Sequence, residues 1–220
     1  KKYKGDGHPV LVLPGFMASD TSTNPLRKFI KKLGYKAYAW ELGRNTAKLE
    51  ILDVLMDKLE DIYHETGQEV TVIGWSLGGV YARQMAKEKP NMVRQVITLG
   101  SPFGGITEPN NATWMYNIVS NGKRVVDLDS ELLSDIPRPA PVPTTAIYTK
   151  EDGVVPWEVC MEKEESSIHQ NIQVRGSHLG LGVNISVLNI VADRLMLYKE
   201  DWIHFEPQSI VSDLIFYPSF

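Results

Sequence analysis

The most informative short motif in this 220-residue sequence is Gly74-Trp-Ser76-Leu-Gly78, which has the form G-x-S-x-G. It follows the β-branched run at residues 70–73 and precedes a segment with helical periodicity. A serine in a tight turn between a strand and a helix has an exposed hydroxyl that can attack a carbonyl carbon. Glycines on either side leave room for the close approach of strand and helix. The motif therefore predicts that Ser76 is a nucleophile, and a serine in an ordinary glycine-rich turn is the alternative.

A serine hydroxyl becomes a useful nucleophile only when a base takes its proton. His178 follows the last predicted strand, in a loop bounded by Gly176 and Gly180 that we expect to be mobile. Loops after parallel strands emerge at the same carboxyl edge of a sheet, so His178 should lie near Ser76. We expect His178 to be the base, with a surface loop histidine as the alternative. The remaining histidines are expected at a strand start, near a helix end, in a polar connector and in the C-terminal segment: His8, His64, His169 and His204.

A third group, an acid, is needed to orient the imidazole of the base. Asp152 comes directly after the strand expected at residues 144–149, so it should also lie at the carboxyl edge of the sheet. An Asp-Gly pair is a common turn signal as well, which is the alternative interpretation. Glu151, Asp127 and Asp129 remain open as other candidates for the acid.

Backbone N–H groups are expected to stabilise the negative charge that develops on the carbonyl oxygen. Leu77 follows the nucleophile at the start of a helix, so its N–H is one predicted donor. The second donor should come from the loop after the first central strand, where Phe16 is the expected residue and a plain turn is the alternative. The residues expected to line the substrate pocket are Met17, Trp75, Trp114 and Tyr116.

Short β-branched runs alternate with longer stretches of helical period, which predicts an α/β fold with a mostly parallel central sheet and helices on both faces. Strands are expected at residues 8–13, 36–40, 69–73, 93–99, 144–149 and 171–175. Helices are expected from Asn24 to a stop at Gly34, from about residue 49 to a stop at Gly67, at residues 79–89, and from Asn184. In the first helix, Asn24 is the expected N-cap and Pro25 the first helical residue.

The one long interruption of this alternation spans about residues 104–143 and ends in a proline-rich connector. We expect a single domain over residues 1–220, with this interruption forming a short cap or lid above Ser76. A cap of this length is too short to enclose a long acyl chain, so short- to medium-chain acyl groups should be preferred. The charged stretch at residues 162–165 is expected to be a solvated face.

Several pieces of the sequence resemble the α/β-hydrolase superfamily, and most closely its small bacterial lipase and esterase branch. They are Val-Leu-Val-Leu-Pro-Gly-Phe, Gly-Trp-Ser-Leu-Gly-Gly, Ile-Thr-Leu-Gly-Ser-Pro and Gly-Ser-His-Leu-Gly. The resemblance covers about residues 8–198 and implies cofactor-free hydrolysis of carboxylic esters through an acyl-enzyme on Ser76. Asp152 and His178 then complete the triad, in the chain order that this superfamily uses. The chain departs from many lipases at Pro14, where they have histidine, and it lacks the first two strands of the full superfamily sheet.

Composition narrows the range of partners and cofactors. Hydrophobic residues make up 43% and charged residues 23%, and the net charge is −4 with no block of Lys or Arg longer than two residues. This balance argues against a nucleic-acid partner, whose phosphates require a basic surface. The single Cys160 excludes an internal disulfide and a cysteine-based zinc site, and we expect no metal and no cofactor. No apolar run reaches the roughly 18 residues of a transmembrane segment.

The expected partner is therefore a small-molecule ester, and the oligomeric state is left open. A cytoplasmic location is expected from the lone cysteine, with secretion as the alternative because residue 1 is Lys rather than Met. An acyltransferase or a thioesterase would use the same three groups and differ only in the acceptor or the leaving group. A non-catalytic ligand receptor on the same fold is a less favoured alternative.

Overall fold

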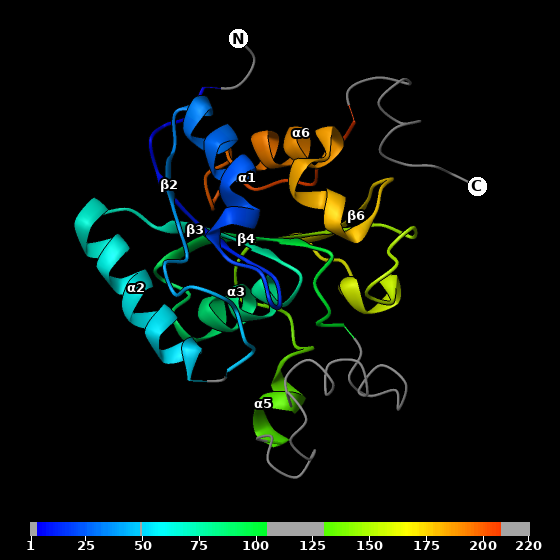
Figure 1. Ribbon diagram of the computed structural model, residues 1–220. Helices are drawn as coiled ribbons and strands as arrows, with labels where there is room; N and C mark the ends of the chain where they lie inside the picture. Colours follow the sequence, from blue (N-terminus) through cyan, green and yellow to red (C-terminus); the bar gives the residue numbers. More distant parts are fainter. Residues whose placement is uncertain (1–3, 49, 105–129, 208–220) are drawn as a thin grey trace.

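The computed structural model describes residues 4–48, 50–104 and 130–207, which are built around one parallel sheet (Figure 1). The sheet order is β2-β1-β3-β4-β5-β6, and every neighbouring pair is parallel. The strand bounds are β1 (Pro9–Leu13), β2 (Lys36–Tyr38), β3 (Val70–Trp75), β4 (Val93–Leu99), β5 (Thr144–Tyr148) and β6 (His169–Gln173). Each strand was expected from the sequence, and β6 begins two residues earlier than expected.

Helices cover both faces of the sheet, as expected (Figure 1). On one face lie α1 (Asp20–Leu33) and α6 (Ile185–Arg194), and on the other lie α2 (Ile51–Thr66) and α3 (Leu77–Glu88). The shorter elements are α5 (Ser130–Asp135) and two 3₁₀ segments, η2 (Trp157–Cys160) and η3 (His178–Val183). The predicted fold class is therefore confirmed.

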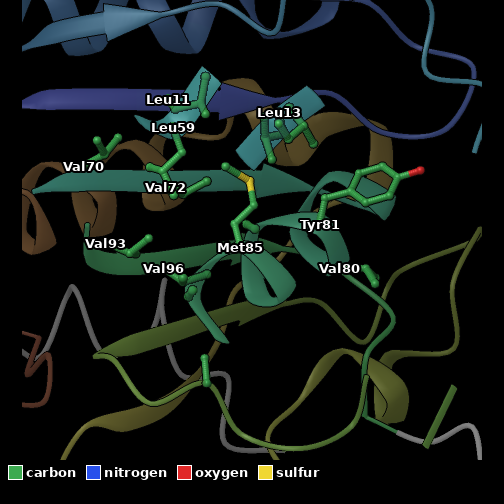
Figure 2. Close-up of a cluster of buried hydrophobic side chains, with 14 of the residues drawn as sticks. Leu11, Leu13, Leu59, Val70, Val72, Val80, Tyr81, Met85, Val93 and Val96 are labelled. Atoms are coloured by element: carbon green, nitrogen blue, oxygen red, sulfur yellow. The ribbon is translucent and has the colours of Figure 1, made fainter. Parts of the chain in front are cut away.

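Strand β1 explains why the central strands are apolar on both faces. Val10 and Val12 pack into the core under α1 and α6, whereas Leu11 and Leu13 pack into the core under α2 and α3. Successive side chains of a strand point to opposite faces, so a strand covered by helices on both sides needs an uninterrupted apolar run. Figure 2 shows the core on the α2 and α3 side, formed by Leu11, Leu13, Leu59, Val70, Val72, Val80, Tyr81, Met85, Val93 and Val96.

Helix α1 begins at Asp20, five residues before the start expected from its proline. The carboxylate of Asp20 accepts hydrogen bonds from the backbone N–H groups of Trp40 (2.8 Å) and Glu41 (2.9 Å). These bonds fasten the first turn of α1 to the segment that follows β2. Pro25 therefore lies inside the helix, where its ring removes one intrahelical hydrogen bond. A contact between distant parts of the chain overrides the local capping signal at Asn24.

The C-terminal ends of α1 and α2 and the start of α6 follow their local sequence signals. Gly34 and Gly67 end α1 and α2 in the left-handed conformation, with φ values of 101° and 65°. Asn184 caps α6, and its side chain accepts hydrogen bonds from the N–H groups of Ser186 and Val187. The predicted start of a helix at Asn184 is confirmed, and the structure shows that this residue is its N-cap.

The charged stretch at residues 162–165 is not uniformly solvated, because Glu162 is buried. Its carboxylate forms an ion pair with the buried guanidinium of Arg83 on α3. Arg83 also donates to the carbonyl oxygen of Arg138 at 2.9 Å and lies 3.8 Å from the ring centroid of Phe103. Burying a charge is tolerable only when it is paired and hydrogen-bonded. The expectation of a solvated face was wrong for Glu162, whose partner lies 79 residues away along the chain.

A buried histidine lies just before β1, at the edge of the sheet opposite Ser76. His8 is fully buried, and its Nδ1 lies 2.6 Å from Oδ1 of Asp6 while its Nε2 lies 3.0 Å from Oγ1 of Thr71. Burial and the positive charge of Arg94 lower the pKa of His8 from 6.5 to about 4, although the Asp6 carboxylate acts in the opposite direction. His8 is therefore neutral in the folded protein at neutral pH.

This depressed pKa predicts a loss of stability in mild acid. Below pH 6.5 the unfolded chain takes up a proton at His8 that the folded protein refuses until about pH 4. The free energy of unfolding should therefore fall by about 2 kcal/mol between pH 7.5 and pH 5 through this group. Urea unfolding at the two pH values measures the loss. His8→Gln should show a smaller pH dependence than the wild type, and an unchanged dependence would contradict the prediction.

Candidate active site

Ser76 occupies a strained turn between β3 and α3. Its backbone has φ 53° and ψ −125°, a conformation that non-glycine residues rarely adopt. Its N–H donates to the carbonyl oxygen of Leu99 at 2.8 Å, which fixes the turn against the end of β4. A Cβ atom on Gly78 would lie 2.6 Å from the carbonyl oxygen of Leu13 and 2.8 Å from that of Pro14. The second glycine of the motif is therefore required by the packing of α3 against the end of β1.

His178 and Asp152 form a close hydrogen-bonded pair. Nδ1 of His178 lies 2.6 Å from Oδ2 of Asp152, and both side chains are buried. The other carboxylate oxygen of Asp152 accepts the N–H groups of Val154 (2.9 Å) and Val155 (2.8 Å). An imidazole that donates its Nδ1 proton to a carboxylate has Nε2 as its proton-accepting atom.

The surroundings of Asp152 keep its carboxyl group ionised. Burial acts to raise its pKa, but the hydrogen bonds from His178, Val155 and Val154 outweigh burial and hold the pKa below its ordinary value. A carboxylate accepts hydrogen bonds only, so an ionised Asp152 requires the proton of the pair to reside on His178 Nδ1.

The end of β4 connects the serine with the His–Asp pair. Ser76 is bonded to Leu99, and a Cβ atom on the next residue, Gly100, would lie 3.0 Å from His178 Nδ1 and 3.3 Å from Asp152 Oδ2. The three residues predicted from the sequence thus all lie at the carboxyl edge of the sheet, after β3, β5 and β6, and a side-chain hydrogen bond joins His178 and Asp152. Two sequence expectations about the histidines differ from the structure: His178 lies buried in η3 rather than in a loop, and His169 lies in β6 rather than in a connector.

Two backbone N–H groups lie beside Ser76. Leu77 is the first residue of α3, and Phe16 lies in the turn after β1. In the described part of the chain, neither N–H donates to a protein acceptor. The turn after β1 is in contact with the serine, because a Cβ atom on Gly15 would lie 3.0 Å from the Cβ of Ser76 and 3.7 Å from its Oγ.

Trp75 contacts the His178 segment in a way that the sequence did not predict. Its indole Nε1–H donates to the carbonyl oxygen of His178 at 3.1 Å, and a Cβ atom on Gly182 would lie 2.7 Å from its ring. The indole therefore supports η3. Met17 is half-exposed beside Phe16, and the other two residues expected in the pocket, Trp114 and Tyr116, lie outside the described residues.

The alternative acids lie elsewhere. The carboxylate of Glu151 accepts the N–H of Gly176 at 2.9 Å and so anchors the segment that leads to His178. Asp127 and Asp129 lie outside the described residues. The sequence favoured Asp152 and left Glu151 open; the structure distinguishes them because the two carboxylates have different partners, Gly176 and His178.

Within the ranges 4–48, 50–104 and 130–207, no group of three His, Cys, Asp or Glu residues could hold a metal ion. Cys160 is buried, and burial raises the pKa of its thiol well above the ordinary value, so the thiol is unreactive. None of the helices formed by these residues combines the length and apolar character needed to span a bilayer.

Sequence comparison identifies relatives among acyl hydrolases. The sequence model of the palmitoyl protein thioesterase family matches residues 9–139. A pimeloyl-[acyl-carrier protein] methyl ester esterase from Aromatoleum aromaticum is 31% identical over 71 residues. That match spans 31% of this chain and only 26% of the relative.

Solved structures with the same fold are remote in sequence. A monoacylglycerol lipase from Paleococcus ferrophilus superposes with a TM-score of 0.63 at 13% identity, over 88% of this chain and 95% of that one. Lipase B from Aspergillus fumigatus gives a TM-score of 0.67 at 16% identity, over 90% of this chain and 55% of that one. The thioesterase domain from the curacin biosynthetic pathway gives 0.58 at 13% identity, over 89% and 93%. At these identities the likeness concerns the fold.

Gly100→Ala should disrupt the pair formed by His178 and Asp152. The added methyl group meets both side chains, and the φ of +55° at this position disfavours any residue with a Cβ. We expect kcat for a nitrophenyl ester to fall by at least about tenfold, in line with the cost of a misplaced catalytic group. Gly153→Ala is the matched control, because its Cβ would enter open space. Equal activities of the two variants would show that Gly100 does not set this geometry.

Proposed function

The chain belongs to the palmitoyl protein thioesterase family, and we propose that it cleaves acyl esters and thioesters through an acyl-enzyme formed on Ser76. Its relatives and its fold identify it as a hydrolase of the lipase, esterase and thioesterase type within the α/β-hydrolase superfamily. The observation that carries the proposal is the 2.6 Å hydrogen bond between His178 and Asp152, at the sheet edge where Ser76 occupies its strained turn.

In the proposed mechanism, Asp152 holds the Nδ1 proton of His178, so that Nε2 is free to take the hydroxyl proton of Ser76. Oγ then forms a bond to the carbonyl carbon, and the π electron pair moves onto the carbonyl oxygen. The N–H groups of Phe16 and Leu77 stabilise that negative charge. His178 gives its proton to the departing alcohol or thiol as the carbon–oxygen or carbon–sulfur bond breaks. Water, activated by His178, releases the acid from Ser76 in the same way.

The same groups serve oxygen esters and thioesters, which differ in the leaving atom. The sequence pattern favours an esterase, and the curated relative is named as a methyl ester esterase. The family match favours thioesters as a second substrate class. A thiolate is a better leaving group than an alkoxide, so a site able to cleave esters has the groups that thioester cleavage needs.

We propose that residues 1–220 form a single domain and that about residues 104–143 form a cap within it. Residues 105–129 are outside the described residues, but the chain on their C-terminal side is bound to α3. Lys87 donates to the carbonyl oxygen of Asp135 at 2.5 Å and to its carboxylate at 3.0 Å, and Arg83 donates to the carbonyl oxygen of Arg138. These bonds between α3 and the return to β5 support a cap of about residues 104–143 that is anchored on the hydrolase core.

Substitution of the three proposed catalytic groups tests the mechanism. Ser76→Ala, His178→Ala and Asp152→Asn should each lower kcat, by about 10³-fold or more for the first two. The effects should not add in combination, because the three groups act as a unit. A fluorophosphonate should label Ser76 alone, as read by mass spectrometry of peptides. His64→Ala, on the exposed side of α2, is the control and should match the wild type. Labelling of another serine would overturn the assignment.

A panel of substrates tests the acyl preference. We expect kcat/KM for nitrophenyl esters to rise over the first few acyl carbons and then to level or fall, because each methylene contributes about 0.8 kcal/mol only while it meets pocket wall. Acyl thioesters of matching length should be cleaved as well. The measurement covers acetate to palmitate, below micelle-forming concentrations. A steady rise to palmitate would show that the pocket accepts long chains and that the cap was wrongly judged too short.

A further inference from the structure

The turn after β1 has only one backbone N–H available to a substrate between residues 16 and 18. The N–H of Met17 donates to the backbone carbonyl oxygen of Asn45 at 2.7 Å. The N–H of Ala18 donates to the carbonyl oxygen of Gly15 at 3.1 Å. In the described part of the chain, the N–H of Phe16 has no such acceptor. The direction of this one N–H therefore depends on how the turn is held on either side of it.

Asn45 holds the turn at three points. Its side-chain Nδ2 donates to the carbonyl oxygen of Pro14 at 2.9 Å, before Phe16 in the chain. The backbone carbonyl oxygen of Asn45 accepts the N–H of Met17. The backbone N–H of Asn45 donates to the carbonyl oxygen of Ala18 at 2.8 Å, and both of these partners come after Phe16 in the chain. Asn45 is fully buried, so these bonds are shielded from water.

The orientation of the Asn45 amide is itself fixed. Its Oδ1 accepts the N–H of Ala47 at 3.1 Å, while Nδ2 faces the carbonyl oxygen of Pro14. In a flipped amide, Oδ1 would face the carbonyl oxygen of Pro14 and Nδ2 would face the N–H of Ala47. Each contact would then bring together two acceptors or two donors, so only one orientation of the amide satisfies both contacts. The side chain therefore acts as a rigid link between the loop after β2 and the turn after β1.

The turn needs such a link because its backbone is strained. Met17 has a φ of 58°, in the left-handed region that favours glycine. A strained conformation persists only where surrounding contacts over-determine it, and strained residues cluster at functional sites. Here the contacts on both sides of Phe16 come from Asn45, a residue 31 positions from Pro14 in the chain.

We propose that Asn45 is the positioning residue of the oxyanion hole: it aims the N–H of Phe16 at the oxygen that becomes negatively charged. This inference rests on the proposed acyl-enzyme mechanism. Preorganised donors act mainly on the transition state, so the loss of Asn45 should lower kcat and leave substrate binding almost unchanged.

Two substitutions test this role. Asn45→Asp is nearly isosteric but replaces the Nδ2 donor by an oxygen that faces the carbonyl oxygen of Pro14. Asn45→Ala removes the link without placing a charge in the buried loop, so it is the milder variant if the first folds poorly. The control is Arg44→Ala, on an exposed neighbour. Fluorophosphonate titration counts the reactive serines, so kcat is expressed per competent site.

We expect both Asn45 variants to lose about 10- to 100-fold in kcat, with KM for a nitrophenyl ester within about threefold of the wild type. A trifluoromethyl ketone forms a tetrahedral adduct with Ser76 whose oxygen carries negative charge, as in the transition state. Its inhibition constant should rise by the same factor by which kcat/KM falls. Arg44→Ala should match the wild type in all three quantities.

Three results would overturn parts of this scheme in distinguishable ways. If kcat per titrated site is unchanged and only the melting temperature falls, Asn45 has a structural role alone. If KM rises, kcat is unchanged and the inhibition constant of the ketone rises only as much as KM does, Asn45 shapes the substrate pocket instead. If Ser76→Ala retains activity, the proposed function fails, whatever the Asn45 variants do.

Discussion

The site depends on the backbone of Ser76, which is held with a positive φ between the central strand β3 and the buried helix α3. Such a conformation costs on the order of 1–3 kcal/mol and has to be imposed by its surroundings. The N–H of Ser76 is bonded to Leu99 on one side, and its carbonyl oxygen accepts the N–H of Gly79 at 3.0 Å on the other. Residues 77–86 of α3 are all buried, so the helix cannot shift to relieve the turn. The packing of the whole core thereby fixes where the hydroxyl is presented.

The described residues include two close His–Asp pairs, which differ in what surrounds the second ring nitrogen of the histidine. At the amino edge of the sheet, Nδ1 of His8 lies 2.6 Å from Asp6, the same distance as in the pair of His178 and Asp152. The second ring nitrogen of His8 is bonded to Thr71, whereas Nε2 of His178 has no hydrogen-bond partner among the described residues. Arg94 adds a positive charge beside the first pair, which helps to keep His8 neutral. Proton transfer requires an available nitrogen at the reacting edge, so distance to a carboxylate alone does not identify the base.

Features encoded by neighbouring residues could be predicted from the sequence, and those that depend on distant partners could not. The strands, the turn at Ser76 and the cap at Asn184 follow from apolar periodicity, glycine spacing and a single capping side chain. The start of α1 was misjudged because Asp20 is bonded to Trp40 and Glu41, which no local signal reveals. The burial of Glu162 depends on a residue 79 positions away, for the same reason.

The location of the candidate site residues could be predicted from the sequence, but the contacts that hold them in place could not. Parallel strands bring their carboxyl ends to one edge, so the residues that follow β3, β5 and β6 could be placed at that edge without coordinates. The groups that hold them could not, because the bond from Trp75 to His178 spans 103 residues and the bond from Asn45 to Pro14 spans 31. Asn45 lies in a short polar stretch that predicts only a loop.

Within the described part of the chain, three of the groups proposed for catalysis are anchored by contacts that come from the core and from their own loops. The turn at Phe16 is held by Asn45, Asp152 is held by two N–H groups of its own loop, and His178 is held by the indole N–H of Trp75. If residues 104–143 form the proposed cap, substitutions there would be expected to alter which acyl chain is accepted while these contacts are kept. That separation is consistent with the relatives, whose names include methyl ester esterase, monoacylglycerol lipase and thioesterase on one fold. On the proposed mechanism, substrate range and chemistry would be carried by different parts of the chain, so that the first could diverge while the second is kept.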